Sequence, residues 1–374
     1  LRTTPHALDI LNMNVVMEQI HHQPGSLYRQ FHSQRTRREL AELGIFKNTA
    51  VRYTPNDSDH TVDVGLDLLL QDRYSFKIGA EAFQQEQTDA LFTAANLPGI
   101  GLNTQLSKRN AFKQAERIFL DLNGNLSFYN PTPEASLQVL YQMVGRFTFE
   151  VPRLLLYDKL VERWTDRENT FFLSNFYNRK TDLSFSYSFE RPIQFRRSRV
   201  SFAWQNSWFH HPNRRKLQSR LTLLNFTVVQ SRILDASFED DLLGEPDPDA
   251  TDEEKRLRAF FQRDFQPRIL SSFKYYLTWS PFYGKRRDRT TWFVRGGMEL
   301  GGNLPALYDR IQQAAGTGDG DPGDGRINAQ PDSTGLAADG LVYGQYFRLA
   351  AEAKAFIPLG RGNELVCRAY LGWT

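Results

Sequence analysis

From residue 74 onward, apolar and polar residues alternate along the chain with a period of two. Within 344–358, apolar residues occupy the odd positions from Phe347 to Ile357, whereas Arg348, Glu352 and Lys354 occupy even positions. The run 183–189 alternates with serines in the same way. Successive side chains of a strand point to opposite faces of a sheet. Each of these runs therefore predicts a strand with one apolar face and one polar face.

About eleven such strands are expected from the alternation. Their ranges are 74–84, 98–109, 116–129, 143–154, 170–190, 198–209, 217–230, 268–280, 290–303, 344–358 and 364–373. Many are longer than soluble strands usually are, and aromatic residues such as Tyr74, Trp208 and Trp373 lie near their ends, as in an interfacial girdle. A soluble sandwich would also alternate, but its strands would be shorter. The predicted fold class is therefore mainly β, an antiparallel transmembrane β-barrel.

The connections between these strands are of two kinds. Asn110–Ala115 and Gly360–Asn363 are short, whereas Glu239–Glu254 and Gly316–Gly340 are long and polar. In outer-membrane barrels, short turns face the periplasm and long loops face outside. The alternation of strand direction puts these four connections on the sides that this rule predicts.

Residues 1–73 have a different pattern. Apolar residues recur at helical spacing near the start and again up to Leu43, where Gly44 predicts the end of a second helix. Thr36 and Glu39 have the spacing of a capping box, which predicts that this helix is short and starts at Thr36. The strands Phe46–Thr54 and Thr61–Leu70 follow. We therefore predict a small α+β domain over 1–73 and barrel over 74–374.

Composition excludes several classes of function. The chain has 46 Lys and Arg against 43 Asp and Glu, a net charge of +3, and neither half is uniformly basic. This balance argues against a nucleic-acid partner. The single cysteine, Cys367, allows neither an internal disulfide nor a cysteine zinc site and is expected to pack on the apolar face of its strand. No apolar run approaches the length of a transmembrane helix.

No motif in the chain indicates bond chemistry. The glycines of 318–323 match G-x-G-x-x-G, but the aspartates between them would repel a pyrophosphate. The same loop fails as a calcium site, because Gln330 stands where an EF-hand has its closing Glu. The pairs His21–His22 and His210–His211 lack metal-site spacing and are expected to lie on the surface. We predict that the protein is not an enzyme and carries neither cofactor nor metal.

Two sets of strings in the chain match a known family. The first set lies in residues 1–73: Pro24–Tyr28, Thr36, Leu40, Leu43–Asn48 and Asp63-Val64. The second set begins with the first predicted barrel strand: Arg73–Phe76, Gly99–Gly101, Lys108–Phe112 with Glu116, Phe195–Trp204, Gln345–Arg348 and Val366–Gly372. These strings resemble the BamA/TamA outer-membrane assembly family, in particular the TamA-like lipoprotein (TamL) branch found in Bacteroidota. The first set is similar to its last periplasmic POTRA (polypeptide-transport-associated) domain and the second set to its barrel. The resemblance covers essentially the whole chain.

The resemblance implies parts that lie outside this sequence. A POTRA domain begins with a strand, which is expected before Leu1. The family's barrel has sixteen strands, so that about eleven lie within this chain, and its R-G-F/W signature loop is expected beyond Thr374. The Arg of that loop normally meets a lumenal acid, for which Glu299 and Glu352 are the candidates.

The resemblance also implies a function: an outer-membrane protein, with its POTRA domain in the periplasm, that inserts or exports envelope proteins through a lateral seam of the barrel. Expected partners are client outer-membrane proteins, a periplasmic chaperone or TamB-like bridging protein, and outer-membrane lipid. The first strand would form the gate, with Tyr74, Phe76, Ile78, Gly79 and Ala80. The lumen would be lined by charged residues: Lys77, Glu81, Asp121, Arg146, Glu150, Arg295, Glu299, Arg348, Glu352, Lys354 and Arg368.

Two other functions share part of this pattern. A two-partner-secretion pore, which exports one dedicated substrate, has the same two modules. A passive outer-membrane channel has the same alternating strands but gives no role to the POTRA-like unit. Both alternatives stay open at the level of the sequence.

Overall fold

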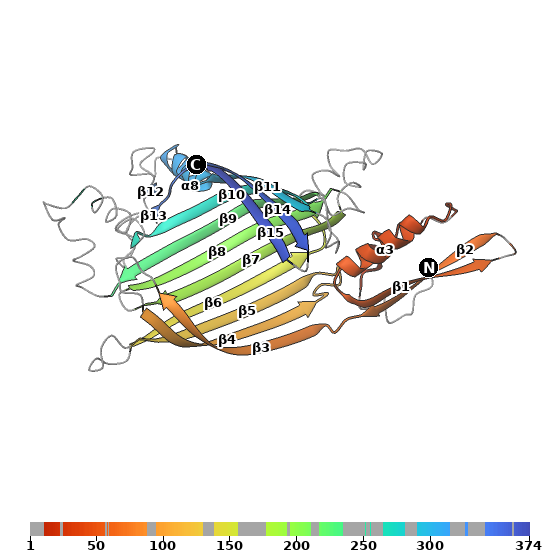
Figure 1. Cartoon of the computed structure of the whole chain (residues 1–374), viewed down its shortest axis with the longest axis horizontal. Coiled ribbons are helices and arrows are strands. Elements are labelled where there is room, and N and C mark those ends of the chain that lie inside the picture. Colours follow the sequence, from red (N-terminus) through yellow and green to blue (C-terminus); the bar gives the residue numbers. More distant parts are fainter. Residues whose placement is uncertain are drawn as a thin grey trace.

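In the computed structural model, the chain forms a small N-terminal unit and one large, curved antiparallel sheet (Figure 1). The structure describes residues 11–22, 25–56, 58, 60–87, 95–129, 138–155, 177–192, 195–210, 217–234, 251, 255, 265–280, 290–314, 326–327, 341–360 and 363–374. The predicted mainly β, antiparallel fold is confirmed for these residues.

The N-terminal unit contains two helices and one hairpin. The helices are α2 (Met13–Met17) and α3 (Gln30–Glu42), and the strands are β1 (Phe46–Asn56) and β2 (Thr61–Leu70). β1 and β2 pair with each other and form a sheet separate from the large one. Both predicted strands are confirmed, and Gly44, with a φ of +67°, follows the second helix as predicted.

The predicted start of the second helix at Thr36 is wrong. α3 already begins at Gln30, so Thr36 lies in mid-helix, fully buried. Its Oγ1 accepts the backbone N–H of His21 at 3.0 Å instead of capping the helix to which it belongs. The residues before Thr36 include no helix breaker, so the helix extends back past the capping-box string.

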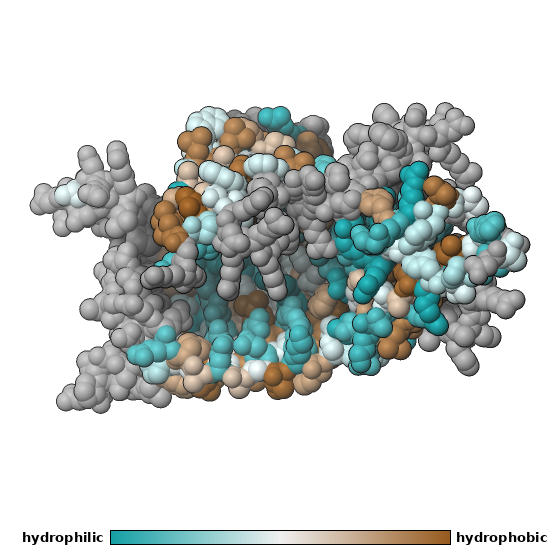
Figure 2. Space-filling view, turned by 45° about the vertical axis from the view of Figure 1, so that its right-hand side comes forward, coloured by the Kyte–Doolittle hydropathy of each residue, from teal (hydrophilic) through white to brown (hydrophobic). Residues whose placement is uncertain are grey.

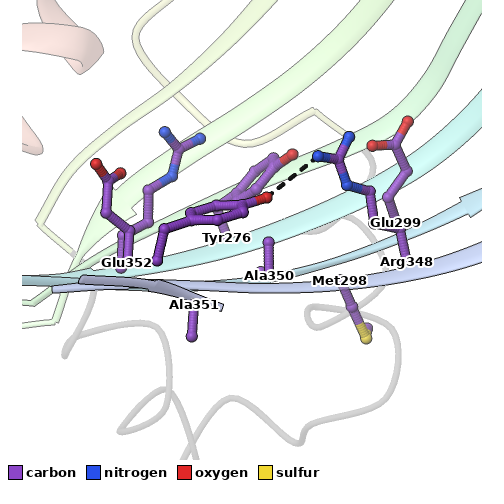
Figure 3. A pocket seen from close by; sticks show the side chains of 10 residues that line it. Tyr276, Met298, Glu299, Arg348, Ala350, Ala351 and Glu352 are labelled. Atoms are coloured by element: carbon purple, nitrogen blue, oxygen red, sulfur yellow. Dashed lines mark hydrogen bonds between the residues drawn. The ribbon is translucent and has the colours of Figure 1, made fainter. Parts of the chain in front are cut away.

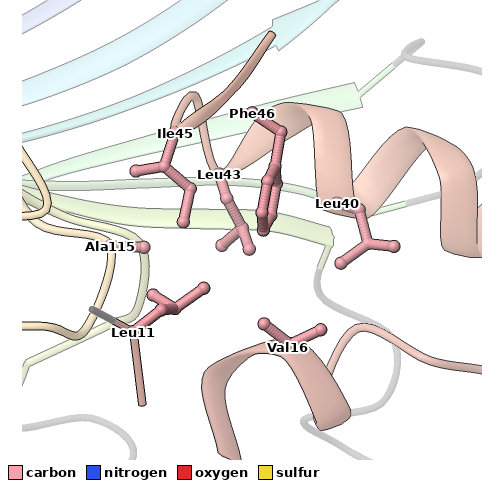
Figure 4. Packing of buried hydrophobic residues seen from close by; sticks show 7 residues of the cluster. All are labelled: Leu11, Val16, Leu40, Leu43, Ile45, Phe46 and Ala115. Carbon is pink, nitrogen blue, oxygen red and sulfur yellow. The ribbon is translucent and has the colours of Figure 1, made fainter. Parts of the chain in front are cut away.

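A hydrophobic core holds this unit together (Figure 4). Leu40 and Leu43 of α3 pack with Ile45, and Leu11 and Val16 approach them from the segment around α2. The core also contains Ala115, which belongs to a turn of the large sheet. The unit is therefore packed against the sheet and is more than a flexible appendage.

The large sheet consists of eleven strands that pair in chain order. They are β3 (Tyr74–Gln87), β4 (Ala95–Arg109), β5 (Arg117–Tyr129), β6 (Gln138–Val151), β7 (Tyr177–Arg191), β8 (Phe195–Phe209), β9 (Leu217–Ile233), β10 (Arg268–Trp279), β11 (Thr291–Gly301), β14 (Tyr346–Gly360) and β15 (Asn363–Trp373). Each corresponds to one predicted strand. β7 begins at Tyr177, with a register irregularity between Tyr177 and Lys180. The prediction for this strand began at residue 170, and its part before Tyr177 lies outside the described residues.

The sequence analysis missed three elements between β11 and β14. They are the helix α8 (Asn303–Ala314) and the two-residue strands β12 (Arg326–Ile327) and β13 (Leu341–Val342). The helical spacing of Leu304, Leu307 and Ile311 was the available signal for α8. The glycine-rich and Gln330 parts of this region, which were considered for nucleotide and calcium binding, lie outside the described residues.

The rule about loop length holds only in part. The short connections after β4 and β14 lie at the end of the sheet that carries the N-terminal unit, as predicted. β6 ends and β7 begins at that same end although they are far apart in the chain, at Val151 and Tyr177, while β7 ends and β8 begins at the opposite end although they are close in the chain, at Arg191 and Phe195. Loop length alone therefore does not decide which end of this sheet a connection occupies.

None of the helices in the described part of the chain combines the length and apolarity that a membrane crossing would need. β3 and β15 lie at the two ends of the strand order. Within the described ranges, β3 pairs only with β4 and β15 only with β14. In the part of the chain that the structure describes, the sheet is therefore open between these two strands.

Candidate functional site

The two faces of the large sheet differ in chemistry. Residues that are directly opposite in an antiparallel pair share a face, so the register connects Lys77 through Gln105 and Asp121 to Arg146. The hollowed side of the sheet is lined with hydrophilic residues, and hydrophobic residues gather along its outer edge (Figure 2). We call the hollowed side the inner face and the other side the outer face.

The register places all predicted lumen residues on the inner face. This set is Lys77, Glu81, Asp121, Arg146, Glu150, Arg295, Glu299, Arg348, Glu352, Lys354 and Arg368. Several of them make polar contacts with other side chains of the inner face. The amide of Gln105 donates to Asp121 at 2.7 Å, and Glu150 pairs with Arg117 and, at 2.8 Å, with Lys180. The inner face thus carries charges of both signs that neutralise each other locally.

One cluster of the inner face surrounds Glu299 of β11. Its carboxylate is 7% exposed, accepts a hydrogen bond from the Tyr346 hydroxyl at 2.6 Å and lies 2.9 Å from the Lys274 ammonium. Nearby, the guanidinium of Arg295 lies 4.2 Å from the ring centroid of Tyr276. A desolvated carboxylate with two donors is a satisfied group, not a vacant site.

A small cavity lies next to this cluster, between β10, β11, β14 and β15 (Figure 3). Glu299, Arg348 and Glu352 point to the same side as Tyr276, whereas Met298 and Ala351 point to the opposite side. Arg348 donates to the Tyr370 hydroxyl at 3.2 Å. Residues that alternate in the sequence therefore lie on opposite faces of the sheet, the charged ones on one face and the apolar ones on the other (Figure 3).

A second cluster surrounds Glu352 of β14. Its carboxylate lies 3.1 Å from the Lys354 ammonium and 2.8 Å from the Arg368 guanidinium. Both candidate acids for the signature-loop arginine, Glu299 and Glu352, therefore already have cationic partners within this chain. An additional arginine would have to share one of these carboxylates with its present partners or displace those partners.

The predicted gate strand, β3, is an edge strand with exposed apolar side chains. Tyr74, Phe76 and Ile78 are 60%, 61% and 65% exposed on the outer face. Ala80 shares their face, while Gly79 lies on the inner face, where a Cβ would meet nothing within 4 Å. Outer-face contacts along β3 are therefore few, and its second edge has no partner among the described strands.

The turn between β4 and β5, residues 110–116, joins the sheet to the N-terminal unit. The backbone carbonyl of Lys113 accepts a hydrogen bond from the Asn12 backbone N–H at 2.7 Å, and Ala115 is 1% exposed in the core of the unit. Inside the turn, the Glu116 carboxylate accepts the backbone N–H groups of Phe112 and Gln114 at 3.2 and 3.0 Å. The sequence analysis used this string only as part of the resemblance and did not predict its role as a junction.

The turn adopts a demanding backbone conformation. Asn110, Lys113 and Ala115 have φ values of +53°, +68° and +63°, a region that non-glycine residues rarely occupy. Asn110 Oδ1 accepts the Ala115 backbone N–H at 3.1 Å, which compensates part of the cost. A further close approach lies beside it, because a Cβ on Gly44 would lie 2.6 Å from an Arg117 nitrogen. The N-terminal unit is thus fixed to the sheet at a defined position.

The junction lies at the first residue of β3. The backbone N–H of Gln71, just after β2, donates to the Ile45 carbonyl at 2.8 Å, and that of Arg109 donates to the Arg73 carbonyl at 2.7 Å. The start of β3 is therefore held between the N-terminal unit and the end of β4. β3 therefore begins directly beside the N-terminal unit.

The histidines of the N-terminal unit make more contacts within this unit than the sequence analysis predicted. His21 Nε2 lies 2.6 Å from a Glu39 oxygen, and Arg35 Nε donates to the other oxygen at 2.8 Å. Burial alone would raise the pKa of Glu39, but these two partners outweigh it and hold that pKa below its usual value. Burial, together with neighbouring positive charge, lowers the pKa of His22 and of His32.

The described residues include no group of three or more His, Cys, Asp or Glu side chains placed to hold a metal ion. The Nε2 atom of His210 is hydrogen-bonded to the Ser219 hydroxyl at 2.6 Å. Cys367 lies on the apolar outer face, as predicted, but its side chain is exposed. The features brought together at this site are therefore strand edges, an apolar face and balanced charges.

No family model matches this chain, and no curated protein does. The solved structures that are similar to it include the following two. One is the crystal structure of BamA from Haemophilus ducreyi lacking POTRA domains 1-3, with 11% identity and a TM-score of 0.48, covering 97% of this chain and 52% of that chain. The other is CdiB from Escherichia coli, with 12% identity and a TM-score of 0.47, covering 98% of this chain and 52% of that chain.

The chain thus spans about half the length of both structures. With identities and TM-scores this low, the two likenesses decide neither the family nor the function of the chain. What the protein does has to be inferred from its own residues.

Proposed function

We propose that this protein is an outer-membrane assembly or export factor of the BamA/TamA family, in its TamA-like lipoprotein branch. Residues 74–374 would be barrel, with the apolar outer face toward lipid and the charged inner face toward a water-filled lumen. Residues 1–73 would be a periplasmic POTRA domain. The sequence strings quoted above and the two-faced sheet support this proposal.

The observation that carries the mechanism is the placement of β3. Its outer side chains are exposed, and its first residue is held beside the N-terminal unit. A strand that opens from its barrel partner at such a position can template an incoming strand by β-augmentation. Clients delivered by the N-terminal unit would meet β3 first.

The energetics favour exchange at this seam. Each backbone hydrogen bond contributes only about 1 kcal/mol net, so that a few bonds between β3 and its barrel partner can be replaced by those of a client strand. Gly79 and Ala80 add little cross-strand packing that would resist opening. The protein would perform no bond chemistry and need no cofactor; its partners would be client outer-membrane proteins, a periplasmic chaperone or TamB-like bridging protein, and lipid.

A disulfide lock tests the seam. Ile78→Cys would be paired with a cysteine at the facing position of the strand that closes the barrel against β3, in the complete protein with Cys367→Ser. We expect the oxidised lock to stop client assembly and a reductant to restore it, with the barrel folded in both states. Normal assembly by the locked protein would exclude the lateral seam and favour transport through the lumen, as in a secretion pore.

A further inference from the structure

The helix α8 presents an unusual surface for a loop element. Leu304, Leu307, Tyr308 and Ile311 are 48%, 54%, 51% and 57% exposed. Their spacing of three, four and seven residues places them on one side of the helix. Four large apolar side chains together form a patch that a loop in water would not be expected to keep.

The opposite side of α8 is fixed to the sheet. Ala306 is buried with Ile269 of β10 and Tyr343, and Phe226 and Val228 of β9 pack against this cluster. Ile269 is opposite Val228, and Val228 is opposite Val200. These residues belong to the outer face, so α8 lies on the apolar outside of the sheet and not over its charged hollow.

The start of the helix is held firmly. The Gly302 backbone N–H donates to the Ser271 carbonyl at 2.8 Å, and Gly302 has a φ of +73°. A Cβ at this position would overlap the Gly344 carbonyl oxygen. The helix therefore leaves β11 in a defined direction, at the end of the sheet opposite to the N-terminal unit.

The residues around α8 indicate that lipid covers the exposed stripe. Exposed apolar side chains continue on the outer face of the adjacent strands, at Met298, Phe347 and Leu349. A helix of this length extends about 18 Å, too short to span a bilayer, and it joins the sheet beyond the end of a strand. An amphipathic helix with Leu, Ile and Tyr on its exposed side is suited to the boundary between headgroups and acyl chains.

We propose that α8 is an interfacial helix that inserts the stripe Leu304, Leu307, Tyr308 and Ile311 into the lipid leaflet at this end of the sheet. The inference rests on the proposed function, in that the outer face of the sheet must face lipid. It adds a second membrane contact to the barrel, with the axis of α8 lying in the plane of the membrane surface.

The test uses a fluorophore that reports its surroundings. Single cysteines at 307, 310 and 349 would be introduced with Cys367→Ser, labelled with an NBD group, and the protein reconstituted in dioleoylphosphatidylcholine vesicles. Lipid-borne doxyl groups and aqueous iodide serve as quenchers. Position 307 should lose fluorescence to doxyl and resist iodide, position 310, at the exposed Arg310 of the same helix, should show the reverse, and position 349 serves as the barrel reference.

The outcomes separate the two proposals. If 349 is quenched by doxyl but 307 is quenched only by iodide, the barrel stands and the interfacial helix is excluded. If 307 is protected from both quenchers, a protein surface covers the stripe, and the lipid proposal is again excluded. If 349 also fails to respond to doxyl, the membrane-barrel proposal itself fails.

Discussion

Glu299 is a buried carboxylate on the inner face, and its two donors make it a sensitive position. Replacing it by alanine leaves the Lys274 ammonium and the Tyr346 hydroxyl without their shared acceptor. Loss of a partner from a buried polar group costs about 1–3 kcal/mol. We expect Glu299→Ala to lower the free energy of unfolding in detergent by this amount and Glu299→Gln to lower it less. Urea titration followed by tryptophan fluorescence measures both, and an unchanged Glu299→Ala midpoint would contradict the cluster.

The N-terminal unit should lose stability on acidification in two steps. Its folded state lowers the pKa of His22 and His32 from 6.5, so their stabilising contribution is complete above that value and is lost as the pH falls through their lower folded values. The lowered pKa of Glu39 acts in the same direction below 4.5.

Hydrogen exchange of the α3 amides in the whole protein, measured from pH 7 down to below pH 3 after correction for intrinsic rates, follows both steps. Glu39→Gln should remove the lower step and His22→Gln should weaken the upper one. Protection that does not change with pH in the unmodified protein would show that these contacts do not support α3.

At the scale of elements, the two-residue period predicted all eleven strands of the large sheet, because each strand has one mainly apolar face and one mainly polar face. The Thr36–Glu39 string misled, because a capping box marks a helix start only where the preceding residues cannot continue the helix. α8 was missed because its stripe is short and lies in a region whose glycines and aspartates dominate the composition.

The turn 110–116 should tolerate glycine but not a β-branched residue at Ala115. Ala115→Val would place a branched side chain at a positive φ and in the buried core of the N-terminal unit, at a cost of about 1–3 kcal/mol. Ala115→Gly loses only a methyl group and relieves the backbone, so it is the matched control. We expect limited proteolysis to release the N-terminal unit faster from the valine variant alone; equal rates would contradict the junction.

At the scale of the whole molecule, the sequence predicted which residues share a face of the sheet. It did not predict which side chains contact each other across strands or between the two units. Alternation alone assigns Glu299 and Arg348 to the inner face. The partners Lys274 and Tyr346 depend on the register of three strands, which a single sequence does not fix. The junction at Ala115 depends on a contact between two units and has no periodic signal at all.

The assignment of faces can be tested directly. Leu349→Cys should react with a lipid-soluble maleimide and Glu352→Cys with a water-soluble one, in the background Cys367→Ser. Glu352 shares its face with Arg348 and Lys354, and an Arg or Lys at mid-depth on the lipid side would cost roughly 2–4 kcal/mol. Stronger lipid-phase modification at 352 than at 349 would reverse the assignment of the inner and outer faces.

The central claim is that client strands pair with the edge of β3. A photo-crosslinking residue at position 78 tests it in cells, with position 122 of β5 as the control, because Leu122 is also an exposed outer-face residue but lies on a strand paired on both sides. The account predicts crosslinks from 78 to outer-membrane proteins during their assembly, and lipid adducts alone from 122. Equal capture of clients at both positions, or none at 78, would contradict it.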